Sequence, residues 1–181
     1  MSKQNNNFFT ISPFKDQDAK ALINWISGSE FDLFLLSSRL THPIKLKSFN
    51  TYFNSIDQKS HKLFSVYLRE TNEHVGHFEI KNINKKYGTG TGAHILLAPN
   101  HRKKGYGKHF INIVSKVGFI DLNLYRMSLS VHTINTKAVS AYIKAGYQFE
   151  GIIRDILMFK GKRYSLYQMS LLKTEWEMLQ K

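Results

Sequence analysis

The sequence predicts an α/β layered fold: a mixed, mostly antiparallel, twisted sheet with helices on both faces. Segments with the composition of strands occur in two settings. Some follow one another through short turns, as in hairpins, and others are separated by segments with helical periodicity. No linker rich in Pro, Gly or Ser and no internal repeat divides the 181 residues. We therefore expect one compact domain.

The expected strands are short apolar or alternating runs bounded by turn-forming residues. Alternation is clearest where Met127, Leu129 and Val131 are interleaved with polar residues, which indicates a half-buried strand. The expected strands cover residues 8–11, 63–68, 75–80, 94–98, 127–131, 149–159 and 164–172. The glycine-dense stretch 88–92 lies between two of these runs and is predicted to be a hairpin connection.

Apolar residues at helical spacing predict helices at 16–25, 44–56, 105–119 and 135–145. Asp16 or Asp18 is the expected N-cap of the first helix, because a short side-chain oxygen can accept from a free amide of the first turn. Pro43 stands just before the second helix, where a proline fits a helix start.

The composition excludes several classes of protein. Hydrophobic residues make up 42% of the chain, which argues against disorder. The absence of cysteine excludes disulfides, thiolate metal sites and a cysteine nucleophile, and the eight histidines show no metal-ligand spacing, so no metal is predicted. The polar start lacks the apolar core of a signal peptide, and no apolar run reaches the roughly 20 residues that span a bilayer. We expect a cytoplasmic protein that does not bind membranes.

The chain is strongly basic, with 26 Lys and Arg against 13 Asp and Glu and a net charge of +13. Such a surface attracts nucleic acid, ribosomes or phosphorylated cofactors. Compositional drift in an AT-rich genome explains the same excess of lysine equally well, so charge alone does not assign a function.

The most informative segment is 95–108, which is predicted to run from a strand through a turn into the start of a helix. Gly105 and Gly107 remove side chains where the backbone turns and approaches a ligand. Amides at a helix N-terminus lack intrahelical partners, and with the helix dipole they bind phosphate oxygens. Neither a Walker loop nor a dinucleotide fingerprint fits the spacing, because His109 and Phe110 occupy required positions.

These residues resemble a known signature. Residues 102–107, Arg-Lys-Lys-Gly-Tyr-Gly, resemble the R/Q-x-x-G-x-G/A motif of the GNAT N-acetyltransferases, and Asn135, Ala138, Tyr142, Gly146 and Tyr147 resemble that superfamily's downstream pattern. Residues 150–176 further resemble a branch that acetylates ribosomal-protein N-termini and small amines. The resemblance implies a single N-acetyltransferase domain over 1–181, an acyltransferase that uses acetyl-CoA as co-substrate.

The resemblance also implies the residues that hold coenzyme A. Backbone amides of the signature loop would bind its pyrophosphate, and an amide of the splayed strand before the loop, which we assign to Leu97, would bind the thioester carbonyl. Asn135 would contact the pantetheine arm or simply cap its helix, and the small Ala138 would leave room for the ligand. The expected cofactor-binding residues are Leu96, Leu97, Ala98, Arg102, Lys103, Lys104, Gly105, Tyr106, Gly107, Lys108, Asn135 and Ala138.

Acetyl transfer to an amine needs a base, because an alkyl amine with a pKa of about 10.4 is mostly protonated near neutrality. Glu79 is the candidate, on the same strand face as His77, which is a weaker alternative base. Glu79 could also bind the substrate ammonium, or lie on a solvated strand face. Tyr142 is the candidate general acid for the departing sulfur, or a core residue.

The expected partners are acetyl-CoA and an amine acceptor, either a ribosomal or other protein N-terminus or a small amine; a homodimer is one expectation for the assembly. Trp25, Phe31 and Phe34 either line the amine pocket or belong to the core. From a different class, a non-catalytic module that binds acyl-CoA or RNA is the alternative function.

Overall fold

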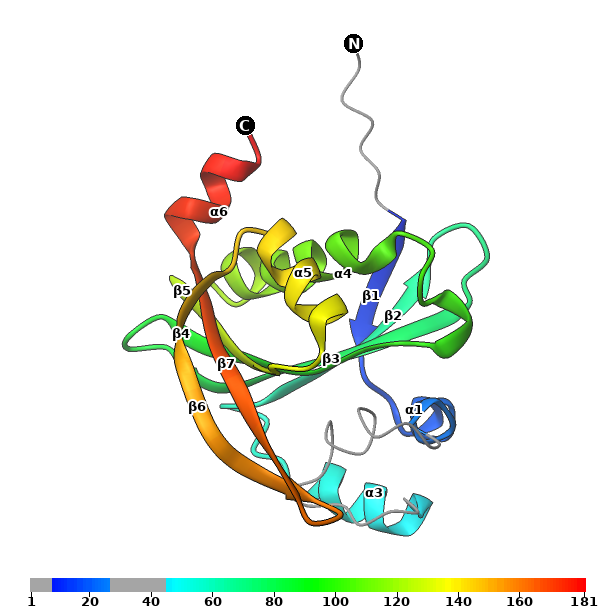
Figure 1. Ribbon diagram of the computed structural model, residues 1–181. Helices are drawn as coiled ribbons and strands as arrows, with labels where there is room; N and C mark the ends of the chain where they lie inside the picture. Colours follow the sequence, from blue (N-terminus) through cyan, green and yellow to red (C-terminus); the bar gives the residue numbers. More distant parts are fainter. Residues whose placement is uncertain (1–7, 27–44) are drawn as a thin grey trace. The chain divides into compact units, whose positions relative to one another are not determined.

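A computed structural model describes residues 8–26 and 45–181 (Figure 1). The chain divides into two compact units. The first unit runs to Glu79 and includes His94–Lys104; the second contains Ile80–Ala93 and Gly105–Lys181. Strands β3 (His74–Asn84) and β4 (Thr89–Leu97) each contribute residues to both units.

The first unit contains β1 (Phe9–Pro13), a 3₁₀ turn (Asp16–Asp18), α1 (Ala19–Trp25), α3 (Leu46–Asn54) and β2 (Lys62–Leu68). A second 3₁₀ turn, Pro99–His101, follows β4. Its strands are ordered β1-β2-β3-β4, and β1 pairs with β2 in antiparallel register.

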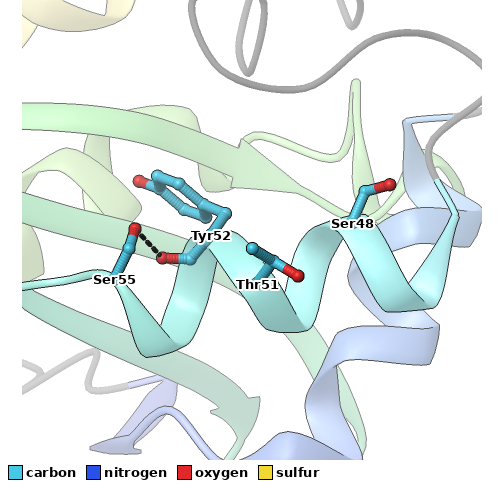
Figure 2. A pocket seen from close by; sticks show the side chains of 4 residues that line it. All are labelled: Ser48, Thr51, Tyr52 and Ser55. Carbon is cyan, nitrogen blue, oxygen red and sulfur yellow. Dashed lines mark hydrogen bonds between the residues drawn. The ribbon is translucent and has the colours of Figure 1, made fainter.

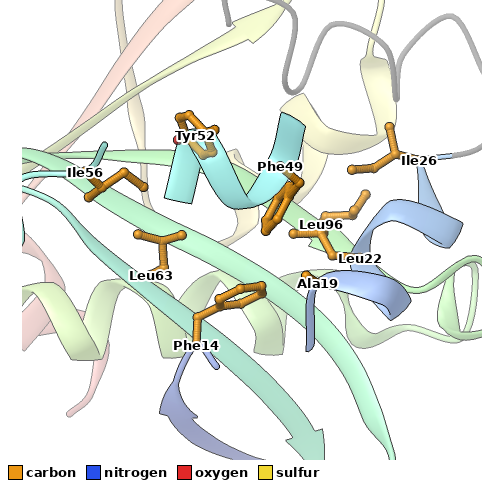
Figure 3. Close-up of a cluster of buried hydrophobic side chains, with 9 residues drawn as sticks. All are labelled: Phe14, Ala19, Leu22, Ile26, Phe49, Tyr52, Ile56, Leu63 and Leu96. Carbon is orange, nitrogen blue, oxygen red and sulfur yellow. The ribbon is translucent and has the colours of Figure 1, made fainter. Parts of the chain in front are cut away.

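The core of the first unit forms where α1 and α3 bring their apolar faces against strand residues (Figure 3). Phe49 of α3 is 1% exposed and its ring lies 5.8 Å from that of Phe14. Burial of such a side chain stabilises the fold by about 1.5–3 kcal/mol. The buried members of this cluster are Phe14, Ala19, Leu22, Ile26, Phe49, Tyr52, Ile56, Leu63 and Leu96.

The second unit contains α4 (Tyr106–Lys116), a π-helical turn (Val117–Asp121), β5 (Arg126–His132), α5 (Thr136–Lys144), β6 (Gln148–Phe159), β7 (Lys162–Leu172) and α6 (Lys173–Leu179). Its strands are ordered β3-β4-β5-β7-β6. Strand β5 is parallel to β4 and antiparallel to β7, and β6 and β7 form an antiparallel hairpin.

The predicted α/β fold with a mixed, mostly antiparallel sheet is confirmed. The glycine-dense stretch was placed wrongly: residues 85–88 form the turn, and Gly90 and Gly92 lie inside β4. A Cβ at Gly90 would come within 2.7 Å of Leu124 Cδ1, so glycine is needed there for close packing and not for a turn.

Asp18, one of the two predicted candidates, stands at the N-cap position of α1, but its side chain makes no cap hydrogen bond to that helix. The carboxylate of Asp18 is buried and accepts hydrogen bonds from Ser65 Oγ at 2.6 Å, from Tyr67 Oη at 3.0 Å and from the amide of Lys15 at 3.0 Å. Asp18 therefore ties the start of α1 to β2 and makes no cap bond to the first turn of that helix. Among the described residues, no helix has the length and apolar character needed to cross a membrane.

Candidate active site

Glu79 lies on β3 within a stretch that is buried at every position from Val75 to Ile80. Both Glu79 and His77 have 0% exposed side chains. His77 Nε2 lies 3.3 Å from Glu79 Oε1, as expected for two residues that share a strand face. The alternative that these side chains form a solvated face is therefore excluded.

Three more side chains converge on the other carboxylate oxygen of Glu79, and all come from the first unit. Tyr52 of α3 donates its hydroxyl to Oε2 over 3.0 Å. His61, which directly precedes β2, brings Nε2 to 2.6 Å from Oε2, and His94 of β4 brings Nδ1 to 2.9 Å. A carboxylate oxygen offers about two lone-pair positions, and Tyr52 and His61 occupy those of Oε2, so His94 Nδ1 makes a close contact there without a hydrogen bond.

The surroundings of Glu79 fix its charge. Burial raises the pKa of its carboxyl, but the contacts from His61, His77 and His94 outweigh burial and hold that pKa well below its ordinary value. Burial lowers the pKa of His77. At neutral pH the site therefore contains a buried carboxylate and a neutral His77 that donates to it from Nε2.

The members of this group differ in access to solvent. The side chains of His61 and His94 are each 16% exposed, whereas Glu79 and His77 are completely covered. A proton that passes between Glu79 and a substrate must therefore be carried by another group, either a side chain or a water molecule. Among the described residues, no group of three or more histidine, aspartate and glutamate side chains has the arrangement needed to hold a metal ion.

A cavity of about 370 Å³ lies along α3, and Figure 2 shows the side chains that line it. Its lining residues are Ser48, Thr51, Tyr52 and Ser55, and the hydroxyl of Ser55 donates to the carbonyl of Tyr52 over 2.7 Å. Tyr52 thus lines the cavity and also donates to Glu79.

The predicted carbonyl-binding strand is the end of β4 and the residue after it. Leu96 is buried in the core of the first unit, and the amide of Ala98 donates to the carbonyl of Val75 over 2.8 Å. The carbonyl of Leu97 accepts from Arg102 Nε at 2.9 Å. The Arg102 side chain therefore braces the turn that leads from β4 into the signature loop.

The helix start predicted from the glycines is present in the second unit. Gly105 precedes α4 with a φ of 81°, and with no side chain it supplies no cap bond to the first turn. A Cβ built at Gly105 would meet no protein atom within 4 Å, so the space beside this backbone is open. At Gly107 a Cβ would lie 3.4 Å from Ala141 Cβ, because α4 and α5 lie close together at this point. Lys103 and Lys104, in the first unit, and Lys108 of α4 are all exposed.

Asn135 and Tyr142 lie at the two ends of α5. Asn135 is the N-cap, and its Oδ1 accepts from the amide of the half-buried Ala138 over 3.2 Å. Tyr142 is buried, with its ring 5.8 Å from that of Tyr147. Burial raises the pKa of Tyr142 far above its ordinary value, so its hydroxyl keeps its proton at neutral pH.

Sequence reasoning missed Tyr52, His61 and His94 as neighbours of Glu79. No motif marks them, because their approach depends on the pairing of β2, β3 and β4 and on the placement of α3. Trp25 packs on the core of the first unit, with its ring 4.7 Å from that of His74, which favours the core role. Phe31 and Phe34 lie outside the described residues.

Comparison with known proteins gives consistent matches. The sequence model of the family described as "Acetyltransferase (GNAT) domain" matches residues 9–148, which extend over both units. An N-acetyltransferase named p20 from Bacillus licheniformis is 26% identical over 168 residues, which cover 92% of this chain and 94% of p20. A spermidine N(1)-acetyltransferase from Vibrio cholerae is 30% identical over 82 residues, 45% of this chain and 47% of that one.

Solved structures agree in fold. The crystal structure of spermidine N-acetyltransferase from Vibrio cholerae in complex with CoA and spermine is similar with a TM-score of 0.81 and 22% identity. The match covers 95% of this chain and 99% of that one.

Proposed function

Since this chain belongs to the GNAT family of acetyltransferases, we propose that it transfers an acetyl group from acetyl-CoA to a primary amine by direct attack of the amine on the thioester. The observation that carries the proposal is the start of α4, where an uncapped first turn follows Gly105 and a Cβ at Gly105 would meet open space. Backbone amides at a helix start beside open space suit a diphosphate.

The residues of the signature loop have complementary roles in this proposal. The amides from Gly105 to Lys108 hold the pyrophosphate of coenzyme A, and the exposed Lys103, Lys104 and Lys108 add positive charge along the same stretch of chain. The strand Leu96–Ala98 offers the amide of Leu97 to the thioester carbonyl, where negative charge develops during attack.

The departing sulfur must gain a proton, and the attacking amine must lose one. Tyr142 donates its hydroxyl proton to the coenzyme A sulfur as the carbon–sulfur bond breaks, because burial keeps the phenol protonated. The proton lost by the amine goes to the group built around Glu79, whose carboxylate is the buried negative charge of the first unit's site. Asn135 and Ala138 border the pantetheine arm.

The acceptor is a protein N-terminus or a small monoamine, and a polyamine is disfavoured. The described residues that line the cavity beside α3 carry hydroxyl groups and no carboxylate. The charge of Glu79 is already engaged by hydrogen bonds from Tyr52, His61 and His77 and by the close contact with His94. The chain as a whole carries a net charge of +13, which repels polycations. In this respect we expect the chain to differ from the relative named for spermidine.

An acceptor screen tests the proposal. Purified protein and acetyl-CoA are combined with peptides that carry free N-termini, with monoamines and with spermidine, and release of coenzyme A is measured together with the mass of the product. We expect turnover with a peptide or monoamine. Tight binding of coenzyme A without turnover on any amine would favour a non-catalytic acyl-CoA-binding module, and binding of RNA without coenzyme A would favour an RNA-binding module.

A further inference from the structure

The buried carboxylate cannot itself meet an acceptor amine. Its side chain is 0% exposed, and Tyr52, His61 and His94 all approach the single oxygen Oε2 while His77 occupies Oε1. A direct base must instead present an unprotonated atom to the amine. The base has to be one of the side chains between Glu79 and the surface.

Two imidazoles meet that requirement. His61 and His94 are each 16% exposed, and each turns one ring nitrogen toward Glu79. The nitrogens of an imidazole lie on opposite sides of the ring, so a proton held between one nitrogen and the carboxylate leaves a lone pair on the other. His77 cannot present a nitrogen to the amine, because its side chain is completely buried.

The backbone conformation of His94 distinguishes it from His61 as the candidate base. His94 lies in the middle of β4 with a φ of 46°, a left-handed conformation that costs free energy for a residue with a Cβ. This conformation accompanies the approach of Nδ1 to 2.9 Å from Glu79 Oε2. The strand then continues to Leu97, the residue that we assign to the thioester carbonyl.

One residue of the cavity wall packs against the ring of His94. Tyr52 lines the cavity, and its ring lies 6.5 Å from that of His94 in an edge-to-face arrangement. Within residues 8–26 and 45–181, the titratable groups around His94 are Glu79 and His77 on β3, His61 before β2, and Tyr52 on α3. Among these, Glu79 is the group that carries the negative charge needed to stabilise an imidazolium.

We propose that His94 is the general base of the reaction, with Nδ1 held toward Glu79 and Nε2 presented to the amine, and that Glu79 is a positioning residue. The inference rests on the proposed function. His94 Nε2 takes one proton from the ammonium group, and the free amine forms its bond to the thioester carbon. The carbon–sulfur bond then breaks, Tyr142 protonates the sulfur, the second amine proton returns to Tyr142 through water, and the proton on His94 passes to water.

The contact between His94 Nδ1 and Glu79 is close but not in line for a hydrogen bond, since Nδ1 has no hydrogen-bond partner among the described residues. Catalytic hydrogen bonds are often poorly aligned before substrate binds and tighten only in the complex, so this contact can become a hydrogen bond there. The base is thus expected to gain its full support from Glu79 only as it accepts the proton.

Nitrogen NMR of histidine-labelled protein tests the protonation state without any turnover. His94→Gly assigns the signal by its disappearance. In the neutral form of the His94 ring we expect the proton on Nδ1, toward Glu79, and none on Nε2. A neutral ring protonated on Nε2 would overturn the proposal whether or not an acceptor is known. A screen in which the wild-type chain acetylates no amine would instead defeat the proposed function, so the two failures are distinguishable.

Kinetics with added azoles test the role itself. His94→Gly keeps the left-handed backbone without strain and leaves room for a small ring. We expect kcat to fall about 100-fold, in the range of a lost general base, and to be restored by imidazole and its methyl derivatives in order of their basicity. If the role of His94 were only structural, the rescue would not follow the basicity of the added azole. His61→Gly, which removes an imidazole of equal exposure, is the matched control, and azole rescue there instead of at His94 would overturn the assignment.

Glu79→Gln tests positioning. The amide keeps the shape of the carboxylate but lacks its charge, so we expect kcat to fall while the KM for acetyl-CoA stays unchanged. A variant with normal kcat would show that the carboxylate does not support the base.

Discussion

The hydroxyl of Tyr52 donates a hydrogen bond to Oε2 of Glu79 over 3.0 Å, and both side chains are buried. A residue of α3 is in this way tied to the middle of β3, and the same residue lines the cavity beside α3. The bond joins the wall of the cavity to the buried charge of the site.

Removal of this bond gives the first prediction. Tyr52→Phe leaves the ring in place but removes a donor from a buried carboxylate, and hydrogen bonds to charged groups contribute about 1.5–3 kcal/mol. We expect the free energy of unfolding to fall by about 2 kcal/mol, measured by urea denaturation. Tyr125→Phe, at a ring that is 51% exposed, is the control and should change stability little. Equal stability of Tyr52→Phe and wild type would contradict the hydrogen bond.

The second prediction concerns acid sensitivity. Burial lowers the pKa of His77 below its ordinary value of 6.5. The unfolded chain therefore takes up a proton at His77 that the folded chain refuses, so the contribution of this residue to stability is present above about pH 6.5 and is lost as the pH falls below that value. The lowered pKa of Glu79 acts in a separate window, below its ordinary value of 4.5.

The test compares urea midpoints of wild type and His77→Asn between pH 7.5 and 5.5. We expect the wild-type midpoint to fall more steeply, because the variant has no proton to take up at this position. The slope that remains in the variant comes from His74 and His132, whose pKa values are also lowered by burial. Parallel curves for the two proteins would show that His77 is not held neutral in the folded state.

Local features of the site could be predicted from the sequence, and features that depend on distant pairing could not. Gly105 and Asn135 mark helix starts through chemistry that is visible within a few residues, and both stand where they were expected. The assignment to the GNAT acetyltransferases is confirmed by the family match over residues 9–148. The spacing of the family motifs can likewise be read within short segments of the sequence.

The side chains around Glu79 could not be predicted from local motifs. His61 and His94 approach Glu79 because of the strand register and the left-handed backbone of His94 within β4. Helix α6 was missed because it follows β7 without a break. Glu175 stands at the third position of α6, where a glutamate is typical of a helix start, and its carboxylate accepts from the amide of Leu172 at 2.9 Å. The sequence did not reveal this start, because leucine is not a usual N-cap residue. Gly90 was misread because its partner, Leu124, is distant in sequence.

A third prediction tests the general acid. Tyr142→Phe removes the hydroxyl and keeps the buried ring, so we expect turnover to fall about 100-fold, within the usual range for general acid catalysis. The affinity for coenzyme A, measured by calorimetry, should stay nearly the same. Tyr147→Phe is the comparison, since its hydroxyl bonds to Ser115 Oγ at 3.2 Å and should affect stability more than turnover. Unaltered turnover of Tyr142→Phe would remove Tyr142 from the mechanism.

The last prediction concerns the grip on coenzyme A. Gly105→Val places a branched side chain in the open space beside the first turn of α4, where the backbone has a φ of 81°. The substitution therefore has two effects, backbone strain of about 1–2 kcal/mol and exclusion of a ligand from the amides. We expect calorimetry to show no binding of coenzyme A.

Gly161→Val separates the two effects. Gly161 has a φ of 75°, and a Cβ there also meets nothing within 4 Å, but it lies in the turn between β6 and β7. This variant should carry a similar strain, seen as a similar loss of stability, and bind coenzyme A normally. Because the strain is matched, a loss of affinity confined to Gly105→Val can come only from the blocked approach to the helix start. Normal affinity in Gly105→Val would mean that the diphosphate is held elsewhere.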